Sequence, residues 1–266
     1  MKDVLVRVAY CLVLLLGFSG CSQKKATCNS LNGLQSLSMG GLSKTKMGAL
    51  RAQSIRDTAL SVGARGGLAW RACEINTILL QHESMLYRLF NFNRMMLDKN
   101  ILPPILAEAR NLLALGGTDT IRIADRNYVI LNQAKFVTAA PTWRDYLWLS
   151  YSAPEAPDRS LLPKSREERL VWKQYTEAGW RAGIQQGDLI FKENISRLRR
   201  DFEGMIRYRS LLAQNMVSAP FVAQLDMGVT GGGSEMTVND RVLRITAFPA
   251  LQNTSTEWKP EITPDE

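Results

Sequence analysis

A long helical stretch over about 165–216, crossed by evenly spaced glycines, constrains the fold of this chain more than any other feature. Ser165 followed by Glu168 forms a capping-box pattern at its start. Three glycines recur at four-residue steps and so share one stripe of the helix: Gly179, Gly183 and Gly187. In a membrane this stripe would indicate helix dimerisation, but the flanking Lys, Arg, Glu and Gln residues exclude a lipid-facing span. We expect a second helix to approach closely, with the one bearing Gly63 and Gly67 as the candidate.

The first half of the chain also predicts helices. Apolar residues recur at three- and four-residue steps over about 47–98, which predicts one or two helices there. A proline pair then interrupts the pattern, because proline cannot continue a helix. Beyond it we expect a short helix over about 104–114 that ends at the glycine pair 116–117.

Two stretches carry the signals of β-hairpins. Residues 120–130 alternate apolar and polar side chains around a turn-forming Asp-Arg-Asn at 125–127. Residues 236–246 place two β-rich segments on either side of Asn239-Asp240. The glycines at 231–233 lack the Gly-Lys-Ser/Thr ending of a phosphate-binding loop, so they predict a flexible connection.

These patterns together predict an α+β fold, predominantly helical with two small antiparallel hairpins. The globular body is expected to be a single domain over residues 47–253, and the chain is long enough for one large or two modest hydrophobic cores. Residues 254–266 are expected to form a loose C-terminal tail.

The first twenty residues have the layout of a secretory signal peptide. The apolar run Val8–Leu16 is nine residues long, whereas a membrane-spanning helix needs roughly 20. Phe18-Ser19-Gly20-Cys21 resembles the lipobox of bacterial lipoproteins, in which small residues precede an obligatory cysteine. We expect residues 1–20 to be removed by cleavage between Gly20 and Cys21, with diacylglycerol and an N-acyl chain attached to Cys21. The alternatives are an ordinary secretory signal with an incidental cysteine, and an uncleaved anchor.

The residues that follow Cys21 predict where the protein lies. Ser22 stands where Asp would favour retention at the inner membrane, so the periplasmic face of the outer membrane is the expected location. Residues 21–46 are rich in Ser, Gly, Lys, Asn and Gln, which bury too little apolar surface to order themselves. They therefore predict a flexible tether between the lipid and the body.

The distribution of charge along the chain argues against binding of nucleic acid. The formal charge of +8 falls to +7 in residues 21–266, because 1–20 carry two positive side chains and one negative. The positive residues are spread among acidic ones instead of forming a stripe with aromatics. The densest cluster, 197–200, is followed by Asp201 and Glu203, which predicts a solvated helix face. No direct contact with nucleic acid is expected.

The cysteines leave one disulfide open. Cys11 departs with the signal and Cys21 is acylated, so Cys28 and Cys73 remain able to pair in the periplasm. Because Cys28 lies in a polar stretch of loosely defined position, the unpaired state is favoured over the bridge. Two cysteines and the single histidine, His82, cannot complete a zinc site, so no metal is expected.

No motif predicts catalysis, and we expect no catalytic residues and no cofactor other than the covalent lipid. His82 is the single candidate base and is expected to be a surface helix residue. Aromatic residues cluster at Trp143, Tyr146, Trp148 and Tyr151, where a helix packing an aromatic face into the core is favoured over a sugar-binding platform. The alternative function is therefore a periplasmic envelope hydrolase or a sugar-binding lipoprotein.

The body as a whole resembles the DotC family, lipoproteins of type IVB (Dot/Icm) secretion systems whose conjugative-plasmid counterpart is TraI of the IncI type. The matching segments cover nearly all of residues 57–251: Thr58–Ala64, Gly67–Ala72, Asn100–Pro104, Pro141–Arg144, Tyr146–Trp148, Pro154–Pro157, Leu161–Lys164, Asn215–Ser218, Gly228–Gly231, Gly233–Met236 and Asp240–Thr246. The family has no established catalytic residues, so Cys21 is the one defined site that carries over.

This resemblance implies a structural subunit of an outer-membrane core complex. Its implied role is to place and hold a larger DotH-like subunit together with a second, DotD-like lipoprotein, in an assembly of many copies. Whether the channel exports effector proteins or relaxase-bound DNA is not written in this subunit.

Overall fold

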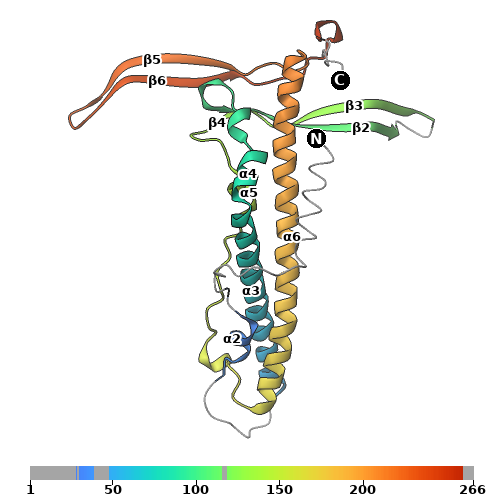
Figure 1. Cartoon of the computed structure of the whole chain (residues 1–266), viewed down its shortest axis with the longest axis vertical. Helices are drawn as coiled ribbons and strands as arrows, with labels where there is room; N and C mark the ends of the chain where they lie inside the picture. Colours follow the sequence, from blue (N-terminus) through green and yellow to red (C-terminus); the bar gives the residue numbers. More distant parts are fainter. Residues whose placement is uncertain (1–27, 29, 39–47, 116–118, 260–266) are drawn as a thin grey trace. The chain divides into compact units, whose positions relative to one another are not determined.

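The computed structural model describes residues 28, 30–38, 48–115 and 119–259, and Figure 1 shows the order of their elements. Helices and three two-stranded antiparallel sheets confirm the predicted α+β class. Contacts divide the chain into two compact units. Unit 1 holds residues up to Gln81 and Ser150–Gly187, and unit 2 holds His82–Leu149 and Asp188–Glu266. The long helix α6 (Arg166–Ala213) contributes its first part to unit 1 and its last part to unit 2.

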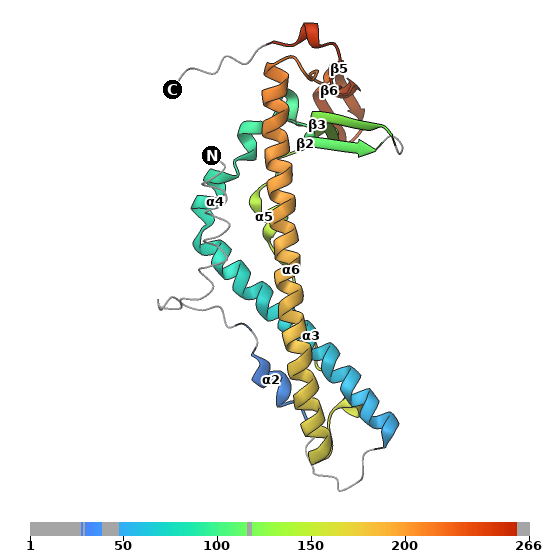
Figure 2. The same ribbon diagram turned by 90° about the vertical axis from the view of Figure 1, so that its right-hand side faces the viewer.

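Unit 1 is built on a glycine seam between α3 (Ala49–Gln81) and the first part of α6, which cross in Figure 2. A Cβ added at Gly183 would stand 2.1 Å from the carbonyl oxygen of Ala64, and one at Gly67 would stand 2.2 Å from that of Trp180. Two more glycines meet the opposite backbone at 2.3 Å: Gly63 and Gly179. The expected close packing of two glycine-bearing helices is confirmed.

The start of α6 confirms the predicted capping box. The Ser165 hydroxyl accepts a hydrogen bond from the Glu168 N–H at 3.1 Å, and the Glu168 carboxylate accepts one from the Lys164 N–H at 2.7 Å. Arg51 of α3 donates to the same carboxylate at 3.1 Å and to the carbonyl oxygen of Leu162 at 2.8 Å. These bonds fasten the N-terminus of α6 to α3, beside the short turn η4 (Arg159–Leu161).

Part of the predicted tether is folded, which corrects the expectation for residues 30–37. Leu34 of the short helix α2 (Leu31–Gln35) and Leu37 just beyond it pack against the core of unit 1, which contains Ile55, Val62 and Trp172. The Trp172 indole N–H donates to the carbonyl oxygen of Leu34 at 3.0 Å. Composition predicted a tether because polar residues dominate the segment, but burial of Leu34 and Leu37 against the core is enough to dock it.

The helical part of unit 2 holds α4 (Glu83–Leu89), α5 (Trp143–Leu147) and the last part of α6 around aromatic side chains. Phe92 stacks on Tyr146 with ring centroids 5.6 Å apart, and Phe202 of α6 meets Phe92 edge-on at 5.1 Å. The predicted one or two helices over 47–98 are thus α3 and α4. Short elements complete the connections: η2 (Phe92–Met95), η3 (Asp98–Asn100), β1 (Ile101–Leu102) and β4 (Lys135–Phe136).

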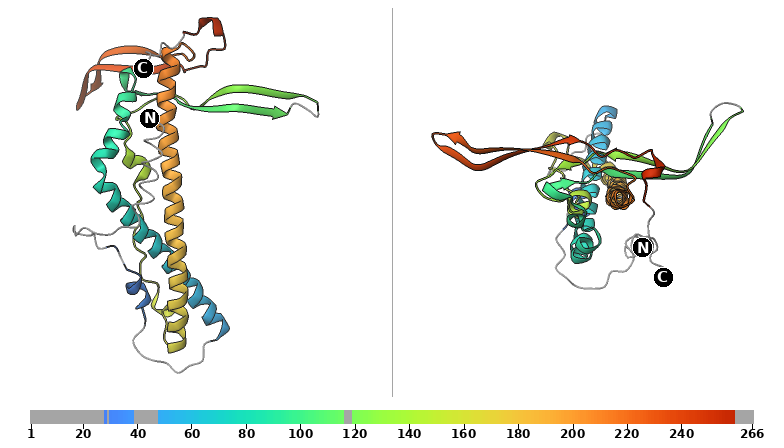
Figure 3. Two further views of the ribbon diagram at one scale, coloured as in Figure 1. Left: turned by 45° about the vertical axis from the view of Figure 1, so that its right-hand side comes forward. Right: turned by 90° about the horizontal axis from the view of Figure 1, so that it is seen from above.

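The helix predicted over 104–114 is wrong, since these residues form strand β2 (Ile105–Leu115). β2 pairs along its length with β3 (Ile121–Asn132), and Figure 3 shows the long two-stranded ribbon that results. The leucines, alanines and Glu108 favour a helix locally, but pairing with the β-branched residues of β3 outweighs that preference. Asn111, with a φ of 52°, has a backbone conformation that no right-handed helix accepts.

The predicted hairpin turn at 125–127 is also wrong, because these residues lie inside β3 and the chain reverses between Leu115 and Ile121. The second hairpin has the same correction. It joins β5 (Phe221–Gly232) to β6 (Glu235–Ala247), and the chain reverses between these strands instead of at Asn239-Asp240.

The turn-like residues of the second hairpin form bulges. Gly228 and Asn239 have φ values of 72° and 58°, and the register shifts at this point. Glycine and asparagine tolerate the left-handed conformation wherever it is needed, and a bulge needs it as much as a turn does. The local sequence signal was therefore right about conformation and wrong about topology.

The C-terminal tail is partly ordered, contrary to the predicted loose tail over 254–266. The turn η5 (Ser255–Glu257) is held against the end of α6, where Asn215 donates to the carbonyl oxygen of Glu257 at 2.8 Å. The backbone N–H of Lys259 donates to the carbonyl oxygen of Gln214 at 2.8 Å. Residues 260–266 lie outside the part that the structure describes.

Candidate interaction surface

The β2–β3 hairpin presents an apolar patch at its free end. Cross-strand partners lie on one face of a hairpin, and here Leu113 pairs with Ile123 and Leu115 pairs with Ile121. Their side chains are largely exposed, with Leu115 at 82% and Ile123 at 67%. We call these four residues the β2–β3 tip patch.

The base of the same hairpin is fastened to α6 by charge. The Glu108 carboxylate accepts hydrogen bonds from Arg110 at 2.9 Å and from Arg207 at 3.2 Å, and Arg207 also donates to the Leu106 carbonyl oxygen at 2.8 Å. The hydrogen bond from Arg110 lowers the pKa of Glu108, burial opposes it, and the positive charges of Arg110 and Arg207 leave the pKa below its ordinary value. Gly204 of α6 lies close to the backbone of Leu106.

This arrangement gives the β2–β3 hairpin a fixed base and a free end. An open, shallow pocket of about 310 Å³ lies beside the base, lined by residues of β2 and α6 that include Glu108, Ser196, Arg199 and Glu203. Arg199 and Glu203 form an ion pair, with their nitrogen and oxygen atoms 2.9 Å apart. The pocket is therefore lined by the charged residues that hold the base of the hairpin on α6.

The β5–β6 hairpin has a second apolar patch beyond its bulges. Val229 pairs with Val238, and Gly231 pairs with Met236, so the two valines and the methionine share one face. Met236 is 72% exposed. On the strands at the bulge, the Thr230 hydroxyl donates to the Asp240 carboxylate at 2.7 Å, which holds the distal part in register. We call these three apolar residues the β5–β6 tip patch.

Each hairpin is a two-stranded ribbon with open edges. Strands at the edge of a sheet carry unpaired N–H and C=O groups that favour pairing with another chain. An isolated two-stranded hairpin is only marginally stable in water, and contiguous exposed apolar patches mark interaction sites. Open edges and exposed apolar tips therefore make both hairpins candidate surfaces for binding other proteins.

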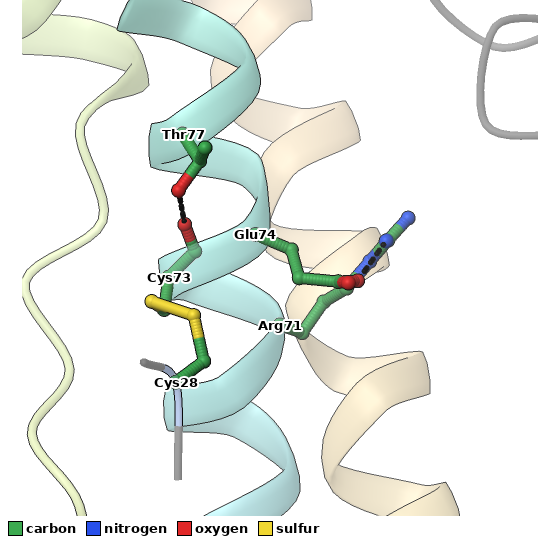
Figure 4. The surroundings of a disulfide bond; sticks show 5 residues. All are labelled: Cys28, Arg71, Cys73, Glu74 and Thr77. Atoms are coloured by element: carbon green, nitrogen blue, oxygen red, sulfur yellow. Dashed lines mark hydrogen bonds and ion pairs between the residues drawn. A yellow bond between two sulfur atoms is a disulfide. The ribbon is translucent and has the colours of Figure 1, made fainter. Parts of the chain in front are cut away.

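The predicted site residues near the N-terminus fall in two places. Gly20 and Cys21 lie outside the described residues. Cys28 and Cys73 are joined by a disulfide, with their Cα atoms 6.1 Å apart, as Figure 4 shows. The sequence had favoured unpaired cysteines. The composition of the segment did not reveal that α2 docks against α3, and this docking brings Cys28 beside α3.

His82 occupies the junction between α3 and α4, half-buried, instead of a helix surface. In the part of the chain that the structure describes, no group of three or more His, Cys, Asp or Glu residues is placed to hold a metal ion. Among the same residues, no helix combines the length and apolar character that crossing a membrane requires.

The aromatic cluster at 143–151 is divided between core and surface. Trp143 is fully buried, as the core interpretation predicted, and presents no ring to a sugar. Trp148 and Tyr151 are partly exposed, so the packing of an aromatic face into the core holds for only part of the cluster. Arg144 lies over the rings of Trp143 and Trp148, with its Cζ 4.8 Å and 5.3 Å from the centroids, and pairs with Glu83 at 2.9 Å.

The basic cluster at 197–200 behaves as the sequence predicted. Leu198 is buried, Arg197 lies over the ring of Tyr146, and Arg200 pairs with Asp201 at 2.8 Å. The exposed hairpin tips, by contrast, were missed as a surface. The signal that could have found them is the run of aliphatic residues on both sides of the glycine pair at 116–117.

Residues 49–260 match the model of the T4SS_TraI family, described as type IV secretory system, conjugal DNA-protein transfer. The match covers both units of the body and both hairpins. A comparison with curated proteins finds no match.

Proposed function

Because this chain belongs to the T4SS_TraI family of type IV secretory system proteins for conjugal DNA-protein transfer, we propose that it is a lipid-anchored structural subunit of the outer-membrane core complex. A component of such a system assembles with other secretion components. The finer proposal is that acyl chains on Cys21 hold the protein on the periplasmic face of the outer membrane, while the folded body binds neighbouring subunits. It is non-catalytic and carries no cofactor beyond its lipid.

The two hairpins carry this proposal. The β2–β3 hairpin has a fixed base in unit 2, and both hairpins have an exposed apolar tip, which is how an arm that docks on a neighbour would be built. Burial of one such aliphatic side chain stabilises a complex by about 1.5–3 kcal/mol. The resemblance to the DotC family supports a DotH-like subunit and a DotD-like lipoprotein as the surfaces that receive the arms.

The hairpin proposal is tested by two matched pairs of substitutions in the full chain. Leu113→Asp with Ile123→Asp places two carboxylates in the β2–β3 tip patch, where both side chains are already exposed in the free protein. We expect normal folding and loss of the DotH-like subunit from the purified envelope complex. Loss of two buried aliphatic contacts weakens the complex by at least about 100-fold, since 1.4 kcal/mol is a factor of ten.

The control pair is Leu50→Asp with Leu170→Asp, which changes two similarly exposed leucines of unit 1. This variant should recover the DotH-like subunit at the wild-type level. Equal recovery by both variants would show that the β2–β3 tip patch binds no subunit of the complex.

The anchor is tested separately by Cys21→Ser. Without the thiol the protein should appear in the soluble periplasmic fraction, and the DotH-like subunit should no longer reach the outer membrane. Retention of the variant on membranes would contradict anchoring by lipid, and normal placement of the DotH-like subunit in a gene deletion would contradict the scaffold role.

A further inference from the structure

Strand β3 has an outer edge that pairs with no other strand in the described part of the chain. The sheet has two strands, so one side of β3 bonds to β2 and the other side leaves backbone N–H and C=O groups unpaired. Figure 3 shows the hairpin as a narrow ribbon. No residue of 121–132 has a positive φ, so nothing interrupts the extended backbone of β3. Its outer edge can therefore accept a further strand.

The outer edge of β2 suits a further strand less well. Asn111 lies in the middle of β2 with a φ of 52°, and a left-handed residue interrupts the extended backbone that a regular ladder of hydrogen bonds requires. Beyond it, residues 112–115 carry no charge and offer no polar side chain to a partner. Strand addition is therefore favoured at β3.

Two arginines of β3 lie on one face beside its outer edge. Arg126 is opposite Arg110 of β2, and Arg122 is opposite Ala114. Residues 122 and 126 are an even number of positions apart, so they share a face, and that face is opposite to the one that carries Ile123. Arg122 is exposed, and the side chain of Arg126 is 63% exposed. We call this side of the hairpin the arginine face.

The arginine face holds more positive than negative charge. Arg110 and Arg126 are directly opposite each other, and like charges in such a pair destabilise a hairpin. The Glu108 carboxylate compensates in part, since it lies 2.9 Å from Arg110 and 3.9 Å from Arg126, but it is also shared with Arg207 at 3.2 Å. Among the described residues Arg122 forms no ion pair. A carboxylate from another chain would therefore meet an excess of positive charge here.

We infer that the outer edge of β3 binds an extended acidic segment of a neighbouring protein, which adds a third strand to the hairpin. In strand addition, backbone hydrogen bonds supply affinity and alternate side chains supply specificity. Carboxylates of the segment lie beside Arg122 and Arg126, which are about 13 Å apart along β3, so the two acidic residues are four positions apart in the segment. The edge site rests on the proposed function, because it gives the chemistry of a surface that receives the β2–β3 hairpin.

The other face of the hairpin adds an apolar requirement. Ile121 and Ile123 flank Arg122 in β3, and both are more than half exposed on the face of the tip patch. A residue of the added strand beside either isoleucine would share that face. The segment should therefore carry an apolar residue on each side of the carboxylate that meets Arg122.

A peptide segment fits the site better than a phospholipid surface does. An anionic headgroup would neutralise the guanidiniums of Arg122 and Arg126, but it would leave the backbone groups at the edge of β3 unpaired. An added strand satisfies both the guanidiniums and the backbone groups.

The test uses the full chain in a neutral detergent and a fluorescent peptide of nine residues. The peptide carries glutamate at its third and seventh positions, valine on both sides of each glutamate and threonine elsewhere, so it can add in either direction. The control peptide has glutamine in place of both glutamates. From fluorescence anisotropy we expect the glutamate peptide to bind at least about ten-fold more tightly, because it makes two charge-assisted contacts. Amide hydrogen exchange in residues 121–132 should slow when it binds.

Two double variants locate the site. Arg122→Gln with Arg126→Gln should weaken binding of the glutamate peptide by at least about ten-fold. The matched control, Arg241→Gln with Arg244→Gln, changes two exposed arginines of β6 and should bind as the wild type does. The single variant Arg126→Gln should melt at or above the wild-type temperature, because it removes the opposition to Arg110, so its weaker binding would not be a result of unfolding.

Several results would overturn the edge site. Equal affinity for the two peptides, or for wild type and the Arg122→Gln with Arg126→Gln variant, would show that these arginines only keep an open edge from pairing. Binding without slower exchange in 121–132 would exclude strand addition. Arginine-dependent binding to phosphatidylglycerol vesicles by a protein that ignores the glutamate peptide would identify a lipid surface instead.

The proposed function fails by a different result. Recovery of the DotH-like subunit by the Leu113→Asp with Ile123→Asp variant would contradict docking of the tip patch, and binding of the glutamate peptide by the wild type would still support the edge site. Loss of the DotH-like subunit from that variant, together with equal affinity of the wild type for both peptides, would keep the docking and remove the edge site alone.

Discussion

The glycine seam predicts opposite effects from the same substitution at two positions four residues apart. A Cβ at Gly183 would stand 2.1 Å from the carbonyl oxygen of Ala64 and 2.8 Å from the backbone nitrogen of Leu68. Ordinary contact begins at 3.4 Å, so Gly183→Ala forces backbone of α3 and α6 apart by 1.3 Å (3.4 less 2.1). Backbone atoms cannot rotate away as a side chain can.

The magnitude follows from two opposing terms. Overpacking a well-packed interior costs about 1–3 kcal/mol, and contact with backbone places Gly183→Ala near the upper end. Replacing glycine with alanine inside a helix stabilises it by about 1 kcal/mol. We expect a net loss of about 2 kcal/mol, which lowers the melting temperature by about 4–8 °C for a chain of this size.

Gly187→Ala is the matched control on the same stripe of α6. Its Cβ would meet the Cγ and Cβ atoms of Arg71 at 3.0 Å and 3.1 Å, so relief needs a shift of a few tenths of an ångström at the root of one side chain, far less than at Gly183. The helix-propensity gain then remains, and stability should be unchanged or rise by up to about 1 kcal/mol.

Thermal unfolding followed by far-ultraviolet circular dichroism measures both variants. The reasoning is refuted if Gly183→Ala melts at or above the wild-type temperature, or if the two substitutions lower it equally. Equal losses would mean that alanine destabilises the packing at both positions of α6 and that the contact with α3 is no closer at Gly183 than at Gly187.

Two further predictions concern contacts within unit 1, the bond from Arg51 to Glu168 and the bond from Trp172 to Leu34. Burial raises the pKa of Glu168, but hydrogen bonds from Arg51 and from the backbone of 164–165 outweigh it and leave the pKa below its ordinary value of 4.5. A carboxyl group with a lowered pKa in the folded state stabilises the fold at pH values above its unfolded pKa, and this stability is lost as the pH falls through the folded pKa. The melting temperatures of wild type and Glu168→Gln should therefore differ at neutral pH and converge below about pH 4. A constant difference down to pH 3 would contradict this. Trp172→Phe removes the donor to Leu34, which should cost about 0.5–1.5 kcal/mol and speed hydrogen exchange in residues 30–37, and unchanged exchange there would show that the indole N–H does not hold α2.

The two units carry different parts of the proposed function. Unit 1 contains both contacts that hold the N-terminal segment, at Cys28 and Leu34. Unit 2 contains both exposed hairpins. The helix α6 contributes its first part to unit 1 and its last part to unit 2.

The two hairpins show which features of the candidate surface the local sequence does not predict. Hairpins were predicted near both places where they occur, but with turns at 125–127 and 239–240 that lie inside strands. Asp, Asn and Gly report a tolerance for unusual backbone conformation, which serves bulges as well as turns. Whether a residue ends a strand depends on which segment pairs with it, and that partner lies beyond any local window.

Features whose cause is local can be predicted from the residues that form them. The spacing of Gly179, Gly183 and Gly187 defines a stripe on any helix, and the capping box at 165–168 begins one wherever that chain lies. Tertiary structure alone decided that 105–115 is a strand and that Cys28 reaches Cys73. In both cases the energy comes from contacts with a distant segment, β3 for the strand and α3 for Cys28, and these contacts outweigh a local preference that points elsewhere.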